Sequence, residues 1–105
     1  MSLKPGVKLN GVKPELVVAM IEARAIWTAH GAPFVITSVC DGTHMRGSEH
    51  YSGCAFDLRI IQDDVAMAQA VSELKVALGM EFDVIWEARG TPNAHLHCEW
   101  QPKAS

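Results

Sequence analysis

The stretch Ser48-Glu-His-Tyr-Ser-Gly-Cys-Ala-Phe-Asp57 is the part of the chain around which the remaining elements are best understood. It brings His50 to a loop and Asp57 to the start of an apolar strand, with Gly53 as the pivot between them. Forty residues after Asp57 the chain supplies a second group of histidines, His95-Leu96-His97. Two histidines and a carboxylate form a ligand set that suits Zn²⁺ and leaves a fourth position for water.

Size and composition limit the functions that this chain can have. Its 105 residues are enough for one domain with a single core, so we expect residues 1–105 to form one unit. The hydrophobic fraction of 49% is ordinary for a globular protein. A net charge of −3 argues against nucleic-acid binding, which needs a basic face. We expect no membrane insertion, since no apolar run of about 18 residues is present.

The termini and the cysteines bear on the compartment. The first residues lack the apolar core of a secretory signal, so we expect synthesis as a cytoplasmic protein. The three cysteines, Cys40, Cys54 and Cys98, cannot all pair within one chain, which favours free thiols and a reducing compartment. We interpret Cys54 and Cys98 as small core residues, because a buried free cysteine behaves as a small hydrophobe.

The first half of the chain predicts an arm, a helix, a strand and a long loop. Residues 1–13 are rich in Lys, Gly and Pro and are interpreted as an extended N-terminal arm. Apolar residues recur at helical spacing over 14–30, with a proline at the start and Gly31 after the end. Residues 34–38 are apolar and β-branched, which predicts a strand, and 39–52 are interpreted as a functional loop.

The second half predicts three strands and one more helix. Strands are expected at 55–61, 82–87 and 94–101, and a helix is expected between Asp63 or Asp64, either of which can cap it, and Gly79. For that helix we expect an apolar face of Val65, Ala68, Val71, Leu74, Ala77 and Leu78. The predicted fold class is α+β, with a small antiparallel sheet of about four strands and two main helices.

Strand alternation assigns the candidate site residues to one face. In a strand, successive side chains point to opposite faces, so Asp57 and Arg59 point away from the core. By the same rule His95, His97 and Glu99 share one face. Four of the five histidines fall in two short clusters, 44/50 and 95/97, which favours a shared metal site over scattered surface histidines.

The residues around the first cluster match a family pattern. Ser48-x-His50-x-x-Gly53-x-Ala55-x-Asp57 resembles the signature of the D-alanyl-D-alanine metallopeptidases, which include vancomycin-resistance dipeptidases and phage L-alanyl-D-glutamate endolysins. The later segments 82–87 and 95–98 resemble the amino-terminal signalling domain of hedgehog proteins, which shares the fold and the zinc site. The resemblance covers about residues 35–100 and implies a hedgehog/DD-peptidase-like fold.

Carried over by position, the resemblance implies a role for each of five residues. His50, Asp57 and His97 would be the ligands of one Zn²⁺ per chain. Glu87 would be the general base that takes a proton from the attacking water. His95 would stabilise the oxyanion of the tetrahedral intermediate.

The position of the base departs from the family pattern. Relatives place the acid only a few residues before the ligand histidine, whereas Glu87 lies ten residues before His97. If residues 88–94 fold out as a hairpin loop, Glu87 can still face the metal. Otherwise Glu99 is a possible base, or it can be a group that orients a histidine.

Three residues are candidates for binding the substrate. Arg46 lies four residues before His50, where family peptidases often hold a substrate carboxylate, but a solvated loop arginine fits equally well. Arg59 is an alternative on the Asp57 face, and Tyr51 can line the cleft.

The resemblance implies a zinc peptidase that cuts a bond in the stem peptide or cross-link of bacterial peptidoglycan. D-Ala-D-Ala carboxypeptidase, L-Ala-D-Glu endopeptidase and cross-link endopeptidase activities all remain compatible. We expect a monomeric phage or prophage product that acts on the cell wall once it is released or carried in the virion. The competing expectations are a zinc-containing hedgehog-like binding module without catalysis, or a structural phage component.

Overall fold

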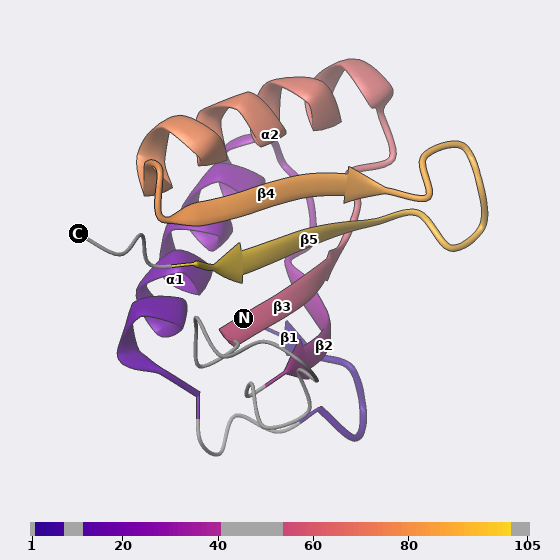
Figure 1. The fold of residues 1–105 in the computed structure, drawn as a ribbon. Helices are drawn as coiled ribbons and strands as arrows, with labels where there is room; N and C mark the ends of the chain where they lie inside the picture. Colours follow the sequence, from indigo (N-terminus) through magenta and orange to yellow (C-terminus); the bar gives the residue numbers. More distant parts are fainter. Residues whose placement is uncertain (1, 8–11, 41–53, 102–105) are drawn as a thin grey trace.

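A computed structural model describes residues 2–7, 12–40 and 54–101 of the chain. Its elements form two layers, with two helices covering a mixed five-stranded sheet (Figure 1). The helices are α1 (Pro14–Ala29) and α2 (Asp64–Leu78). The strands are β1 (Ser2–Leu3), β2 (Val35–Cys40), β3 (Cys54–Arg59), β4 (Phe82–Glu87) and β5 (His95–Trp100).

The sheet has the strand order β1-β2-β3-β5-β4. All neighbouring strands are antiparallel except β1, which pairs with β2 in parallel. The α+β class with two helices and an antiparallel group of four strands is therefore as predicted. The fifth strand comes from the arm that the sequence predicts as merely extended. Its amides at Ser2 and Lys4 donate to the carbonyls of Phe34 and Ile36, at 3.2 and 2.8 Å.

Both helices begin and end where the local sequence predicts. Pro14 opens α1, and Gly31, with a φ of 72°, follows its end. Asp63 caps α2 by accepting a hydrogen bond from the amide of Val65 at 3.0 Å. Gly79, with a φ of 80°, ends α2 because a residue without a Cβ adopts this conformation freely.

The buried face of α2 is rotated from the predicted one, and the two share Leu74, which is buried, and Val71 and Leu78, which pack half-buried against the core. Met67, Ala70 and Leu74 are buried, whereas Val65 at the start of the helix is 67% exposed, and Ala68 and Ala77 are also exposed. The buried residues follow the i, i+3, i+7 spacing of a helix face. Met67 on this face also contacts the connection from β3, where the amide of Ile61 donates to its sulfur at 3.4 Å.

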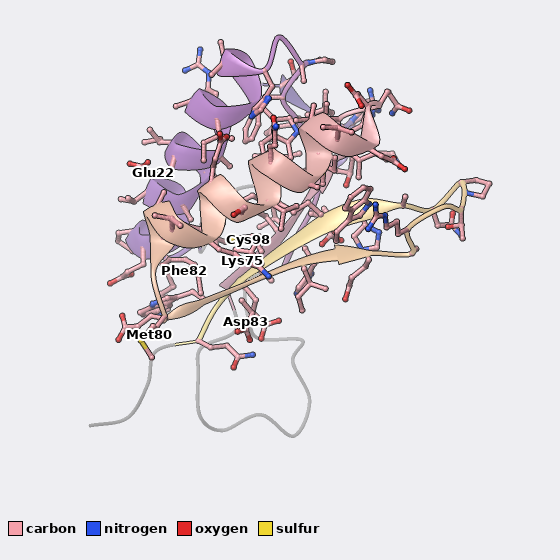
Figure 2. The ribbon with its side chains drawn as sticks, turned by 90° about the horizontal axis from the view of Figure 1, so that it is seen from above. Glu22, Lys75, Met80, Phe82, Asp83 and Cys98 are labelled. Atoms are coloured by element: carbon pink, nitrogen blue, oxygen red, sulfur yellow. The ribbon has the colours of Figure 1, made fainter. Side chains whose placement is uncertain are left out.

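The core lies between the helices and one face of the sheet (Figure 2). Trp27 of α1, Phe56 and Leu58 of β3, and Leu96 and Cys98 of β5 are all fully or almost fully buried in it. Burial, above all, raises the pKa of the Cys98 thiol to about 12, so this cysteine is an inert core residue, as expected. The opposite face of the same strands carries the polar residues, and no described helix covers it (Figures 1 and 2).

Candidate metal centre

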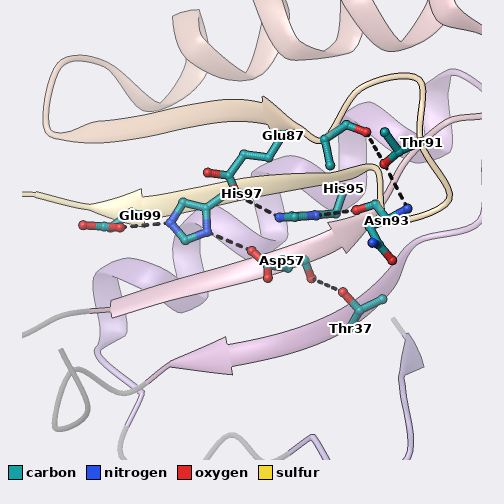
Figure 3. A network of polar contacts seen from close by, with 9 residues as sticks. Thr37, Asp57, Glu87, Thr91, Asn93, His95, His97 and Glu99 are labelled. Carbon is teal, nitrogen blue, oxygen red and sulfur yellow. Dashed lines mark hydrogen bonds and ion pairs between the residues drawn. The ribbon is translucent and has the colours of Figure 1, made fainter.

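The pairing of β3 with β5 places Asp57 directly opposite His97. Asp57 Oδ1 and His97 Nδ1 are 2.8 Å apart, and the two side chains are 25% and 23% exposed (Figure 3). Phe56 and Leu58, the sequence neighbours of Asp57, are buried in the core, so alternation holds the carboxylate on the open face as predicted. Two residues forty positions apart in the sequence thus form one polar pair.

A second carboxylate holds the other side of the His97 ring. His97 Nε2 lies 2.9 Å from Glu99 Oε1, and Glu99 Oε2 accepts a hydrogen bond from Gln101 at 2.7 Å. Glu99 is only 8% exposed. The hydrogen bond to Asp57 is the main cause that raises the pKa of His97 to about 9, and the bond to Glu99 adds to it, while burial acts in the opposite direction. A His97 ring that donates from both nitrogens to these two side chains is an imidazolium.

His95 and Glu87 form a second pair on the same face. They are opposite each other in the pairing of β4 with β5, and His95 Nε2 lies 2.8 Å from Glu87 Oε1 (Figure 3). His95 Nδ1 donates to the backbone carbonyl of Asn93, also at 2.8 Å, which orients the ring. This backbone bond, above all, and then the bond to Glu87 raise the pKa of His95, whereas burial lowers it.

The seven residues between Glu87 and His95 fold out as a hairpin loop. The Thr91 hydroxyl donates to the carbonyl of Ala88 at 2.7 Å and accepts from the amide of Asn93 at 3.1 Å. Ala88, with a φ of 54°, turns the chain away from β4. The insertion therefore leaves Glu87 in register with His95, and on the face of the sheet that carries Asp57 and His97.

The structure describes two of the three predicted metal ligands. Of the three predicted ligands, Asp57 and His97 lie together, whereas His50 falls outside the described residues, as do Arg46 and Tyr51. Over 2–7, 12–40 and 54–101 no group of three histidine, cysteine or acidic side chains converges on a metal position. Two ligands about 2 Å from a tetrahedral zinc lie about 3.3 Å apart, so the 2.8 Å pair needs only a small adjustment.

An open groove of about 600 Å³ adjoins the two pairs. The residues that line it include Lys4, Thr37, Asp57, Arg59, Asn93 and His95. Arg59 is exposed beside Asp57, on the face predicted for it. The Asp57 and His95 side chains are therefore open to this groove.

Two contributors to the site have no clear signal in the sequence. Thr37 is the extra residue of a β-bulge between Ile36 and Ser38, and its hydroxyl donates to the backbone carbonyl of Asp57 at 3.4 Å. Bulges are frequent beside active sites, but no pattern in 34–38 predicts one. Asn93 acts through its backbone carbonyl, which any residue type possesses.

No family model, no curated protein and no solved structure matches this chain. In the part of the chain that the structure describes, neither helix combines the length and the apolar character that a membrane crossing needs.

Proposed function

We propose that this protein is a zinc-dependent peptidase that hydrolyses a peptide bond of bacterial peptidoglycan. The observation that carries the proposal is the placement of two histidine–carboxylate pairs side by side on one open sheet face. Asp57 with His97 forms the first pair, and Glu87 with His95 forms the second. A histidine–acid pair next to candidate metal ligands is the arrangement that a hydrolytic site needs.

Asp57 and His97 would hold the ion together with His50. Zn²⁺ bound there supplies Lewis-acid chemistry, since it polarises a peptide carbonyl and makes water more acidic. Glu99 already accepts from the far nitrogen of His97, which is how a carboxylate orients a metal-bound histidine. This contact supports Glu99 as the orienting group, and it leaves Glu87 as the candidate base.

Glu87 and His95 would carry out the proton transfers. Glu87 is half-buried at the end of β4 and would take the proton of the attacking water. His95, held by the Asn93 carbonyl, would donate from Nε2 to the oxygen that becomes negative. The 2.8 Å contact between these side chains would keep a proton available to protonate the leaving amine.

The substrate class rests on the resemblance of residues 48–57 to peptidoglycan peptidases. The shape and charge of the groove support it, because an open cleft with an exposed arginine suits a peptide that has small side chains and a carboxylate. A phage or prophage product that reaches the wall after release or in the virion fits the same class.

A non-catalytic binding module or structural phage component is the second candidate. One observation favours it: His97 is held between Asp57 and Glu99, and Gln101 closes the network. A polar network whose members are paired stabilises a fold without any chemistry. In that case binding or removal of the metal would change the melting temperature of the protein, and no peptide bond would be cut.

Mass spectrometry of purified muropeptides separates these functions. Zinc-loaded protein is incubated with substrates containing D-Ala-D-Ala, L-Ala-D-Glu and cross-linked stems, beside a chelator-treated sample. We expect chelator-sensitive cleavage, and the product masses name the bond. His97→Ala should lose zinc, while His30→Ala is the matched control, because His30, directly after α1, pairs with Glu73 of α2 at 2.8 Å. Intact substrates with zinc bound would overturn the peptidase assignment.

A further inference from the structure

The solvent-facing side of α1 is apolar, in addition to the side that packs in the core. Val18 and Ile21 are 57% and 56% exposed. Together with the exposed Pro14 and Ala25 they follow the i, i+4, i+7, i+11 spacing of one helix face, which we call the outer stripe. A helix that is apolar on all sides is normally buried on all sides, so the outer stripe indicates a surface that a partner covers.

An apolar hollow continues the outer stripe. It has a volume of about 240 Å³ and lies between α1, the end of α2 and the start of β4. Leu78 and Phe82, which pack half-buried against the core, contribute to its lining, and so does Val18 of the outer stripe. The volume is below the roughly 300–1,000 Å³ of small-molecule sites, so the hollow suits a side chain of a partner better than a free ligand.

The charged residues of the hollow are both acidic. Glu15 and Glu22 line it from α1, and none of the described lining residues is basic. Both side chains are exposed, and within residues 2–7, 12–40 and 54–101 neither takes part in a salt bridge. Glu22 and Phe82 lie toward the same end of the helical layer (Figure 2). Two carboxylates therefore border an apolar surface and are available to the cations of a partner.

The same charges disfavour two other occupants of this surface. In a two-fold symmetric pair of α1 helices, the same flank of each copy meets at the interface, so that the carboxylates of Glu15 and Glu22 would face those of the second copy. An anionic membrane surface would be repelled by these carboxylates and by the net charge of −3. A protein partner with basic side chains is the occupant that the charges favour.

We propose that the outer stripe and the hollow form a docking site for an amphipathic helix of a partner protein, whose apolar stripe is flanked by Lys or Arg. The apolar side chains of that helix would cover Val18 and Ile21, and one of them would enter the hollow beside Phe82. Its basic flank would pair with Glu15 and Glu22. The site lies on the helical layer, whereas the candidate metal centre lies on the open face of the sheet, so the docking site does not depend on the proposed function (Figure 1).

The test uses two synthetic amphipathic peptides of about 18 residues, with leucines on one face and either lysines or glutamates on both flanks. We expect NMR amide shifts of the labelled protein to move along α1 and at Phe82. The lysine peptide should bind about tenfold tighter than the glutamate peptide at low salt, and this preference should shrink at high salt. Glu22→Lys should remove the preference.

Substitutions in the outer stripe test the apolar contact. Ile21→Gln and Val18→Gln should each weaken binding of the lysine peptide by about tenfold, because both remove apolar area at the centre of the site. Val65→Gln is the matched control, since Val65 is exposed at the start of α2 and lies outside the hollow. Circular dichroism checks that each variant is folded. Absence of binding, or equal binding of the two peptides, would overturn the docking site.

Two further measurements, made without peptide, test the other occupants. Sedimentation velocity detects a second copy, and cosedimentation with phosphatidylserine vesicles detects a membrane surface. We expect neither self-association nor vesicle binding. Self-association that Ile21→Gln abolishes would make a second copy the occupant, and vesicle binding that Ile21→Gln abolishes would make it a membrane. Either result would overturn the assignment to a basic helix.

Discussion

The two faces of strand β5 differ completely, although their residues alternate along six positions. On the covered face, Leu96 and Cys98 are fully buried under the helices. On the open face, His95, His97 and Glu99 each pair with polar groups from other positions in the chain. The covered face holds the fold together through apolar burial. On the open face, the strand register determines which charged side chains lie opposite each other. Residues on the open face can therefore change without loss of the apolar core.

The largest effect should come from the open face and concern catalysis. Glu87→Gln keeps the shape and one hydrogen-bond acceptor but removes the proposed base, so we expect turnover to fall by about 10²- to 10⁴-fold with zinc still bound. Glu73→Gln is the control, because Glu73 also pairs with a histidine at 2.8 Å but lies on α2. Turnover and zinc content are measured together. Wild-type turnover in Glu87→Gln would move the role of base to Glu99.

The next effect should come from the covered face and concern stability. Leu96→Ala removes a fully buried side chain between the sheet and the helices, which costs about 2–5 kcal/mol of the free energy of unfolding. Ile85 gives the contrast, because it is 46% exposed on the open face. We expect Ile85→Thr to change the free energy of unfolding by less than about 0.5 kcal/mol. Urea titration measures both variants. Similar costs at the two positions would mean that the open face is covered in solution.

The free energy of unfolding of the metal-free protein should depend on pH through His97, which lies on the open face. The pKa of His97 is raised to about 9 in the folded protein, above the value of about 6.5 expected when unfolded. The stabilisation is therefore complete below pH 6.5 and is lost as the pH rises to 9, a change on the order of 3 kcal/mol. Cys98, whose pKa is raised to about 12, adds a loss of the same sign only above pH 9.

Urea titrations of chelator-treated protein between pH 6 and pH 9 check this slope. His97→Gln should flatten it, because glutamine does not titrate. Excess zinc should reverse it for the wild type, because zinc competes with protons for the ring nitrogen. A wild-type slope that zinc leaves unchanged would contradict the assignment of His97 as a ligand.

The sequence predicts the faces better than the register. Alternation over 95–100 is local, so it assigns His95, His97 and Glu99 to one face and Leu96 to the other. Which residue of β3 lies opposite His97 depends on pairing between distant segments, and only the family resemblance pointed to Asp57. The placement of Glu87 was open for the same reason, since the fold of the 88–94 loop decides it.

Three features of the fold escape prediction for physical reasons. The two residues of β1 are too few to carry a strand pattern, and their pairing depends on the edge that β2 offers. The bulge at Thr37 adds one residue to a pattern that otherwise alternates regularly. The face of α2 was misassigned because Val65 and Ala68 are apolar but exposed, so that periodicity alone allowed a rotated face.

The smallest expected effect on stability concerns the end of β4, where Arg89 covers the last residue of the covered face. Trp86 lies on the covered side of β4 and is half-buried, and the Arg89 guanidinium stacks 4.0 Å above its ring. Because Arg89 is exposed, Arg89→Ala should cost only about 0.5–1 kcal/mol of the free energy of unfolding. Arg24→Ala, on the exposed side of α1, should cost less, and urea titration compares the two. Equal costs would mean that the ring of Trp86 is held by the core alone, so that the covered face extends to the end of β4. A cost above about 2 kcal/mol would mean that Arg89 shields the core at this end, and that the hairpin loop which places Glu87 beside His95 is also a structural element of the covered face.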